Sequence, residues 1–246
     1  MFGLRYIINL YEKHSVACTG MKGSGKDLLT SNVVVRRKKP YNCNIDYSHD
    51  SNYIPLDFND FNVNNTRREL VSGNVNFYEW KHPFGTDVYI SDAGVYFPSQ
   101  YCNELNKEYP YYPLFLAIQR HLTLGGKTHY NCQNLNRVWD KIREMCDIYI
   151  YCHWSIYIKG LVIQKVTIYD KASSCQDRVQ TPRFPIPLSL IPSREAEMNK
   201  QIYLDKFRNT YGRTDTRYLV YFNKAHYDTY HFRKLLMVGK KYDKTN

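Results

Sequence analysis

Residues 15–27 read Ser-Val-Ala-Cys-Thr-Gly-Met-Lys-Gly-Ser-Gly-Lys-Asp, and this stretch decides the fold. Its last eight residues match the phosphate-binding loop pattern G-x-x-x-x-G-K-[S/T] at every fixed position except the final one, which is Asp27. The apolar run 15–19 predicts a strand that enters the loop, and residues 27–35 predict a helix that leaves it. A strand, a glycine-rich loop and a helix in this order predict a site for the phosphates of a nucleotide.

The loop supplies the groups that a polyphosphate needs. Its glycines let backbone N–H groups crowd around the anion, and Lys26 adds a positive charge beside the outer phosphates. The amino end of the following helix adds further positive potential. The expected nucleotide-binding residues are Gly20, Met21, Lys22, Gly23, Ser24, Gly25, Lys26 and Asp27. The alternative is an ordinary glycine turn without a ligand.

Short apolar runs and helical segments alternate after the loop. Strands are expected at 42–47, 87–92, 128–133 and 147–152, and helices at 113–122 and 135–145. This alternation predicts an α/β fold with a mainly parallel, doubly wound sheet. Residues 154–170 alternate apolar and polar side chains, which predicts an antiparallel hairpin at the sheet edge, turning near residues 159–160. The expected fold class is therefore a P-loop NTPase with an edge hairpin.

The composition divides the chain into two parts. Four prolines mark an extended connection, namely Pro182, Pro185, Pro187 and Pro192. We therefore expect a P-loop ATPase domain over 1–180, and a linker with a small basic C-terminal region over 181–246. The net charge is +11, and residues 194–246 hold twelve Lys/Arg against six Asp/Glu. Basic groups among aromatic rings favour single-stranded DNA as a partner. A solvated basic face is the alternative.

Seven cysteines without zinc-ribbon or C-x-x-C spacing predict reduced, packed thiols in a cytosol. The alternative for three neighbouring side chains, Cys146, Cys152 and His153, is a metal cluster. Residues 1–13 mix charges into a short apolar stretch and do not form a secretory signal. The most apolar segment, 147–166, carries too many charges to cross a membrane. We therefore expect a soluble protein.

A second motif follows the strand expected at 87–92. Residues 90–99 read Ile-Ser-Asp-Ala-Gly-Val-Tyr-Phe-Pro-Ser. This segment resembles the Asp-Glu-Ala-x-x-x-Phe-Pro-Ser segment of the zonular occludens toxin-like family, the ATPases of filamentous-phage assembly. Gln119-Arg120-His121 resembles that family's Arg-His pair, and residues 130–143 resemble its Thr-Gln strand end and Ile-Arg helix. The resemblance covers about residues 13–155 and implies ATP and Mg²⁺ as cofactors.

Two residues depart from the family pattern in opposite directions. Ser91 stands where the family has its Mg²⁺-linked aspartate, while Asp27 stands where the loop normally has Ser or Thr. The loop hydroxyl and the strand carboxylate ordinarily meet beside one metal ion, so we predict a reciprocal exchange that makes Asp27 and Ser91 the metal ligands. Asp92 then takes the place of the catalytic glutamate and orients water. The competing interpretation is a degenerate site that does not hydrolyse nucleotide.

Three further residues are candidates for catalysis. Gln133, at the end of its strand, is a candidate sensor between the γ-phosphate and the attacking water, or else a strand-end amide that caps the next helix. Arg120 or Arg143 is a candidate finger that reaches the nucleotide of a neighbouring subunit, as a ring ATPase requires. Each arginine has a surface or salt-bridge role as its alternative.

The leading functional hypothesis is an ATP-driven motor that drives virion assembly and extrusion or DNA translocation. The resemblance implies a homo-oligomeric ring in the host cytoplasm. Family members usually carry a membrane span, so the hypothesis requires a separate membrane or virion-assembly protein, which would hold this chain peripherally at the inner face of the membrane. A soluble viral DNA-packaging ATPase is a variant of this hypothesis. The rivals are a phage nucleoside monophosphate kinase, because such kinases also use loops ending Ser-Gly-Lys-Asp, and a nucleotide-binding structural protein of a virion.

Overall fold

The structure is a computed structural model of the chain. The structure describes residues 3–45, 47, 50–57, 82–101, 103, 107, 112–180 and 194–225. The proline-marked connection expected at 181–193 and most of the loops expected at 48–75 lie outside these residues. So do residues 226–246 of the basic C-terminal region.

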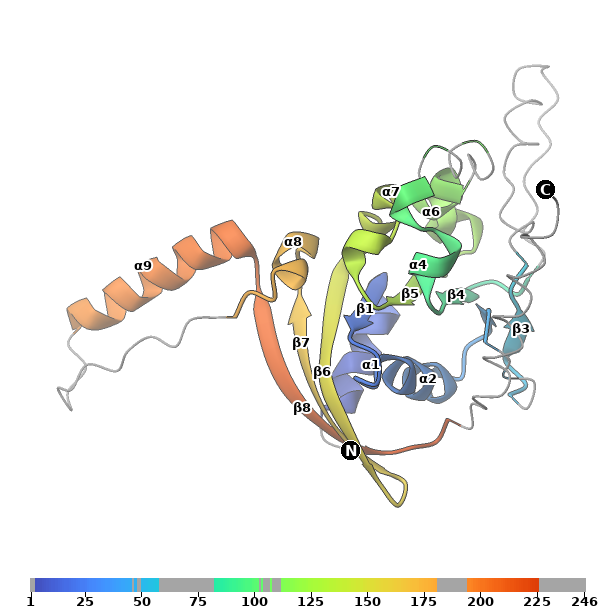
Figure 1. Cartoon of the computed structure of the whole chain (residues 1–246), viewed down its shortest axis with the longest axis horizontal. Coiled ribbons are helices and arrows are strands. Elements are labelled where there is room, and N and C mark those ends of the chain that lie inside the picture. The colour runs from blue at the N-terminus through green and yellow to red at the C-terminus, as the bar shows by residue number, and fades with distance from the viewer. Residues whose placement is uncertain are drawn as a thin grey trace.

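One eight-stranded mixed sheet organises the described chain, in the order β3-β2-β4-β5-β1-β6-β7-β8 (Figure 1). Six strands run parallel: β1 (Val16–Gly20), β2 (Tyr41–Cys43), β3 (Tyr53–Pro55), β4 (Asp87–Ile90), β5 (Thr128–Cys132) and β6 (Ile148–Ile158). Two antiparallel strands, β7 (Leu161–Tyr169) and β8 (Thr214–Phe222), extend one edge. The α/β P-loop fold and its antiparallel hairpin are confirmed.

Helices cover both faces of the sheet, as a doubly wound fold requires. One face packs against α1 (Leu4–Lys13) and α2 (Lys26–Arg37), and their buried side chains form one core cluster with the sheet. The other face carries α4 (Ala93–Tyr96), α6 (Tyr112–Leu122), α7 (Asp140–Arg143) and α8 (Ala172–Gln176), together with the 3₁₀ turns η2 (Ser99–Tyr101) and η3 (Leu135–Arg137). Helix α9 (Arg194–Tyr211) precedes β8.

Strand β1 lies in the middle of the sheet, between β5 and β6, and all five of its residues are buried. A strand buried on both faces reads as an apolar run, which is why residues 15–19 predicted it. The strand ends at Gly20 and α2 begins at Lys26, so the phosphate loop lies at the carboxyl edge of the sheet. Ligands of open α/β sheets bind at this edge.

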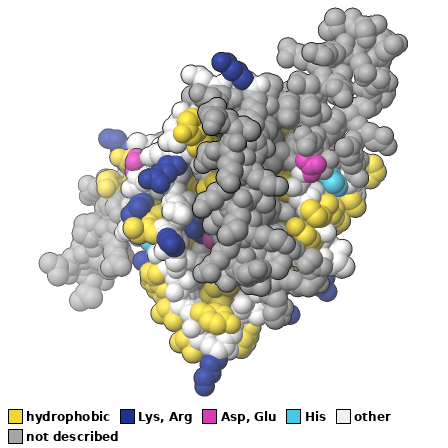
Figure 2. Space-filling model, turned by 45° about the vertical axis from the view of Figure 1, so that its right-hand side comes forward, with side chains coloured by type: hydrophobic (Ala, Val, Ile, Leu, Met, Phe, Trp, Pro, Cys, Tyr) yellow, Lys and Arg dark blue, Asp and Glu magenta, His cyan; other side chains and the backbone are white. Residues whose placement is uncertain are grey.

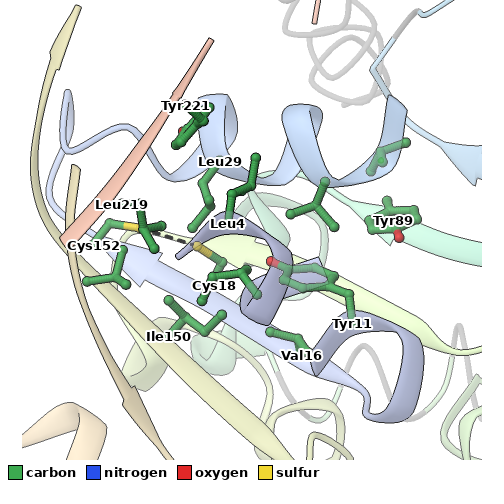
Figure 3. Close-up of a cluster of buried hydrophobic side chains, with 14 of the residues drawn as sticks. Leu4, Tyr11, Val16, Cys18, Leu29, Tyr89, Ile150, Cys152, Leu219 and Tyr221 are labelled. Atoms are coloured by element: carbon green, nitrogen blue, oxygen red, sulfur yellow. Dashed lines mark hydrogen bonds between the residues drawn. The ribbon is translucent and has the colours of Figure 1, made fainter. Parts of the chain in front are cut away.

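Strand β8 changes the expected domain division. It pairs with β7 from Leu161↔Phe222 to Tyr169↔Thr214, so residues beyond 180 belong to the same sheet. Leu219 and Tyr221 are buried in the core cluster, and Figure 3 shows Tyr221 beside Leu29 of α2. The boundary expected at residue 180 therefore does not separate the C-terminal region from the ATPase fold, because alternate residues of β8 complete its core.

Three local expectations differ from the structure. The helix expected at 135–145 is divided into η3 and α7, because Trp139 between them is extended, with φ −48° and ψ 128°. The amphipathic helix α1 lies in residues 1–13, where no helix was expected, and it buries Leu4, Ile7 and Tyr11. The strand expected at 42–47 ends at Cys43.

The thiols agree with the expectation of packing residues. Six cysteines are described, and all are buried and free. Cys18 and Cys152 approach each other at 3.5 Å between their sulfurs without forming a disulfide. Within the described ranges, no group of three His, Cys, Asp or Glu side chains is placed to hold a metal ion, so the alternative of a cluster at Cys146, Cys152 and His153 is not supported. No helix in the described part of the chain is long and apolar enough to span a membrane.

Candidate functional site

The phosphate loop needs glycine at both of its ends. A side chain at Gly20 would meet the backbone oxygen of Cys152 at 2.5 Å. Gly25 has a left-handed backbone with φ 85°, and a side chain there would meet Ser155 Oγ at 2.5 Å. Only glycine combines this φ with so close an approach. The strands β1 and β6 therefore fix the loop tightly against the sheet.

Lys26 opens α2 and is 5% exposed. Burial lowers the pKa of its ammonium group, but the carboxylates of Asp27 and Asp92 raise that pKa more, and the result lies above the ordinary value. Lys26 Nζ is 3.5 Å from Asp27 Oδ2. The loop thus holds a fixed positive charge at the amino end of a helix, where an anion is favoured.

Asp27 and Ser91 are in direct contact, although 64 residues separate them in the sequence. Ser91 lies immediately after β4, and its hydroxyl donates to Asp27 Oδ1 at 3.0 Å. One carboxylate and one hydroxyl therefore meet between the loop and the neighbouring strand end. This is the arrangement that a reciprocal exchange requires; metal binding by the pair stays a prediction.

Two asparagines that sequence reasoning missed hold this pair. Asn131, in β5, donates from Nδ2 to Asp27 Oδ1 at 2.9 Å and accepts from Thr30 Oγ1 at 2.8 Å. Asn44 accepts from the Ser91 N–H at 2.8 Å and donates to the Ser91 carbonyl at 2.9 Å. Asn131 fixes one carboxylate oxygen of Asp27, while Asn44 fixes the backbone that carries the Ser91 hydroxyl.

Asp92 follows Ser91 and has a left-handed backbone, with φ 50° and ψ 48°. Such a conformation is uncommon for a residue with a side chain, although Asp tolerates it better than most. Burial raises the pKa of the Asp92 carboxyl group and the Asp27 carboxylate raises it further, against a smaller lowering by Lys26. Asp92 thus lies within electrostatic reach of both loop residues and is a stronger base than an exposed aspartate.

The other predicted catalytic residues lie apart from this group. Gln133 follows β5, its side chain is exposed, and its carbonyl accepts from Thr19 Oγ1 at 3.4 Å beside the loop. Arg120 is exposed at the end of α6, where its carbonyl accepts from Gly125 N ahead of β5. Arg143 ends α7, just before β6. Both arginines therefore lie near the amino ends of the strands, opposite the loop. The structure does not bring them to the loop of the same chain, and their action on a neighbouring subunit stays a prediction.

The residues present fit ATP and Mg²⁺. The Ser24 hydroxyl is buried and has no hydrogen-bond partner among the described residues, and a phosphate oxygen is an acceptor that would satisfy it. Asp27 and Ser91 offer oxygen ligands, which Mg²⁺ prefers. One or two carboxylates are enough, because Mg²⁺ at a nucleotide keeps waters and phosphate oxygens as its other ligands.

The central loop-bearing strand, the loop's glycines and lysine, and the polar pair at the adjoining strand end define the fold of a P-loop NTPase. The chain matches no protein-family model and no curated protein. It is similar in structure to the genome packaging NTPase B204 from Sulfolobus turreted icosahedral virus 2 in complex with ATP-gammaS, with TM-score 0.40 and 14% identity over 65% of this chain and 93% of that one.

Two other solved structures resemble the chain to the same degree. The N-terminal domain of zonular occludens toxin from Neisseria meningitidis has TM-score 0.41 and 15% identity, over 71% of this chain and 95% of that one. EssC (ATPases 2 and 3) from Geobacillus thermodenitrificans has TM-score 0.39 and 12% identity, over 94% of this chain and 44% of that one. The fold assignment rests on the strand order and loop of this chain itself.

Proposed function

We propose that the chain binds ATP with Mg²⁺ and hydrolyses it. The observation that supports this most directly is the 3.0 Å hydrogen bond between the Ser91 hydroxyl and the Asp27 carboxylate. A phosphate loop that had lost its function would have no reason to keep one hydroxyl and one carboxylate in contact after both positions changed. The buried lysine and the basic Asp92 beside them complete the groups needed for phosphoryl transfer.

Each residue then has a distinct role. Backbone N–H groups of residues 20–26 and the Lys26 ammonium bind the phosphates and stabilise the negative charge that grows on them. Asp27 and Ser91 would hold Mg²⁺, which when bound neutralises charge on the phosphate oxygens. Asp92 orients a water molecule and accepts its proton, and the raised pKa suits that task because a stronger base accepts a proton more readily.

We further propose that hydrolysis drives a motor of phage or virion assembly, or a viral DNA-packaging translocase. Support comes from the sequence of residues 90–99, which combines the strand-end motif with the Phe-Pro-Ser segment. The proposal includes a ring of identical subunits in the host cytoplasm, a single-stranded DNA substrate and a separate membrane partner. In Figure 2, Lys and Arg side chains are scattered over the described part of one face rather than gathered in a single patch.

The deciding experiment measures release of phosphate from MgATP by the purified chain, with and without single-stranded DNA, and tests AMP and dTMP as phosphate acceptors in the same buffer. The ATPase is supported if Lys26→Ala abolishes hydrolysis and Lys13→Ala leaves it unchanged. Lys13 serves as the control because it is exposed at the end of α1. Stimulation by DNA supports the motor. Transfer of phosphate to AMP or dTMP in place of hydrolysis would establish the kinase instead.

A further inference from the structure

Gln164, on β7, contacts the back of the phosphate loop. Its side-chain Nε2 donates to the carbonyl oxygens of Ser24 at 3.2 Å and of Gly25 at 3.0 Å. These carbonyls belong to the peptide units that carry the N–H groups of Gly25 and Lys26, which would bind the phosphates in the proposed nucleotide site. Because a peptide unit points its N–H and its C=O in opposite directions, a donor that holds the carbonyls at the rear also aims the N–H groups forward.

Tyr221, on β8, fixes the orientation of that amide. Its hydroxyl donates to Gln164 Oε1 at 3.0 Å. A flipped amide would place Oε1 against two carbonyl oxygens, which repel it. Gln164 is 0% exposed and Tyr221 1% exposed, so water does not replace either bond. The amide is therefore fully satisfied in one orientation only.

The fit is close on the same side of the loop. A side chain at Gly25 would stand 3.0 Å from Gln164 Nε2 as well as 2.5 Å from Ser155 Oγ. The antiparallel strands thus form the rear wall of the loop, and Gln164 is the polar group in this wall that bonds to its backbone. Figure 3 shows where β8 brings Tyr221, over α2 and next to Leu29.

We propose that Gln164 is a positioning residue for the phosphate loop, and that Tyr221 sets its orientation. The amide holds the loop in the conformation that binds phosphate before the nucleotide arrives. This inference rests on the proposed nucleotide site. It assigns a role in ligand binding to the antiparallel edge of the sheet and to a strand that follows α9.

The test compares Gln164→Leu and Tyr221→Phe with Val166→Ala. Val166 lies on the same strand and is 0% exposed, so its variant is a control for loss of packing. Two properties are measured at a temperature where each variant is folded: the Kd for MgATP, and amide hydrogen exchange of the peptide 20–29 without nucleotide. Gln164→Leu should weaken MgATP binding on the order of 10- to 100-fold and Tyr221→Phe several-fold, corresponding to the loss of hydrogen bonds that hold the loop.

Gln164→Leu should also raise KM more than it lowers kcat, since the amide does not touch the reacting atoms, and it should speed exchange in peptide 20–29. Val166→Ala should lower the melting temperature while leaving both loop properties unchanged. If Gln164→Leu does not change amide hydrogen exchange in peptide 20–29, the inference is overturned, whether or not the wild type binds nucleotide. If the wild type binds no MgATP but its amide hydrogen exchange in peptide 20–29 still depends on Gln164, the proposed function is overturned. The role of Gln164 in holding the loop is then retained.

Discussion

Exchanging Asp27 and Ser91 tests the pairing that defines the site. Three variants are needed: Asp27→Ser, Ser91→Asp and the double exchange. Asp27→Ser leaves two hydroxyls and no carboxylate at the contact, and it takes away the acceptor for Nδ2 of the buried Asn131. Ser91→Asp leaves two carboxylates where the hydroxyl now donates at 3.0 Å. The double variant restores one group of each kind.

The magnitudes are set by these contacts. Each hydrogen bond to a charged group contributes about 1.5–3 kcal/mol, and Asp27 Oδ1 accepts two of them, so Asp27→Ser should lower the free energy of unfolding by about 3–6 kcal/mol. Two like charges at about 4 Å near a protein surface repel by about 4 kcal/mol, which Lys26 offsets in part in Ser91→Asp. The double variant avoids both penalties, so the coupling energy between the two positions should be at least about 2 kcal/mol.

Urea unfolding measures the stability of the four proteins, and phosphate release from MgATP measures turnover. Asp27→Ser should lose at least about 100-fold in turnover, and the double variant should recover at least about tenfold, equivalent to about 1.4 kcal/mol. Ser99→Asp adds the same carboxylate eight residues further along the chain and should combine additively with Asp27→Ser. The reciprocal pairing is refuted if the stability effects of Asp27→Ser and Ser91→Asp add within about 0.5 kcal/mol and the double variant recovers no turnover.

Four other outcomes are expected. Lys26→Ala should abolish turnover and leave the melting temperature within a few degrees of wild type in a thermal scan; unchanged turnover would remove the nucleotide site. Asp92→Asn should lower kcat about 10²- to 10⁴-fold while MgATP still binds in titration calorimetry. The acid limb of the wild-type pH profile of kcat/KM, which reports the free enzyme, should lie above the ordinary aspartate pKa because the pKa of Asp92 is raised. A kcat within twofold of wild type would exclude Asp92 as the base. Burial, and then the charges of Arg37 and two lysines, lower the pKa of His129 well below its ordinary value, so the free energy of unfolding should fall by up to about 1.4 kcal/mol per pH unit as the pH drops below about 6.5. His129→Gln should make this pH dependence less steep in urea titrations. The same slope in both proteins would contradict the buried neutral imidazole. A chain cut after residue 192 should fail to fold by circular dichroism, since it lacks β8; a folded, ATP-binding fragment would show that the core tolerates that loss.

Local spacing made the loop and its partner strand predictable. A phosphate loop is a continuous stretch, and the strand end at Ser91 and Asp92 has an apolar run before it and a recognisable segment after it. The departures at Asp27 and Ser91 were also visible in the sequence, because both residues lie inside motifs with fixed positions. Their contact confirms that the two motifs meet at the same edge of the sheet.

The residues that hold the site could not be found in the same way. Asn44 and Asn131 act through strand pairing, and single asparagines in short strands carry no spacing signal. One signal was present: His129 and Asn131 share one face of β5 by the two-residue period of a strand, and both are buried, whereas Gln133 lies beyond the strand. Polar residues buried at alternate positions must find partners, and that reasoning would have selected Asn131 ahead of Gln133.

The sequence predicted that the C-terminal region is a separate unit. Its strand β8 instead connects this region to the back of the phosphate loop. Residues 214–222 alternate in the pattern of a half-buried strand, but their charge and aromatic content favoured a DNA-binding tail. In the structure this end of the chain contacts both the loop and its helix. Tyr221 acts through Gln164 at the rear carbonyls, and Asn223 Oδ1 accepts from Asn32 of α2 at 2.8 Å.

Two residues separate the end of helix α9 from the start of β8, and the last turn of the helix is held by Lys171, which lies between β7 and α8. Lys171 Nζ donates to the carbonyls of Asn209 and Thr210 in the last turn of that helix, at 3.1 Å in each case. Strand β8 therefore connects α9 in the chain with residues that contact Gln164 and α2. Because each of these contacts joins residues far apart in the sequence, no local pattern could have predicted them.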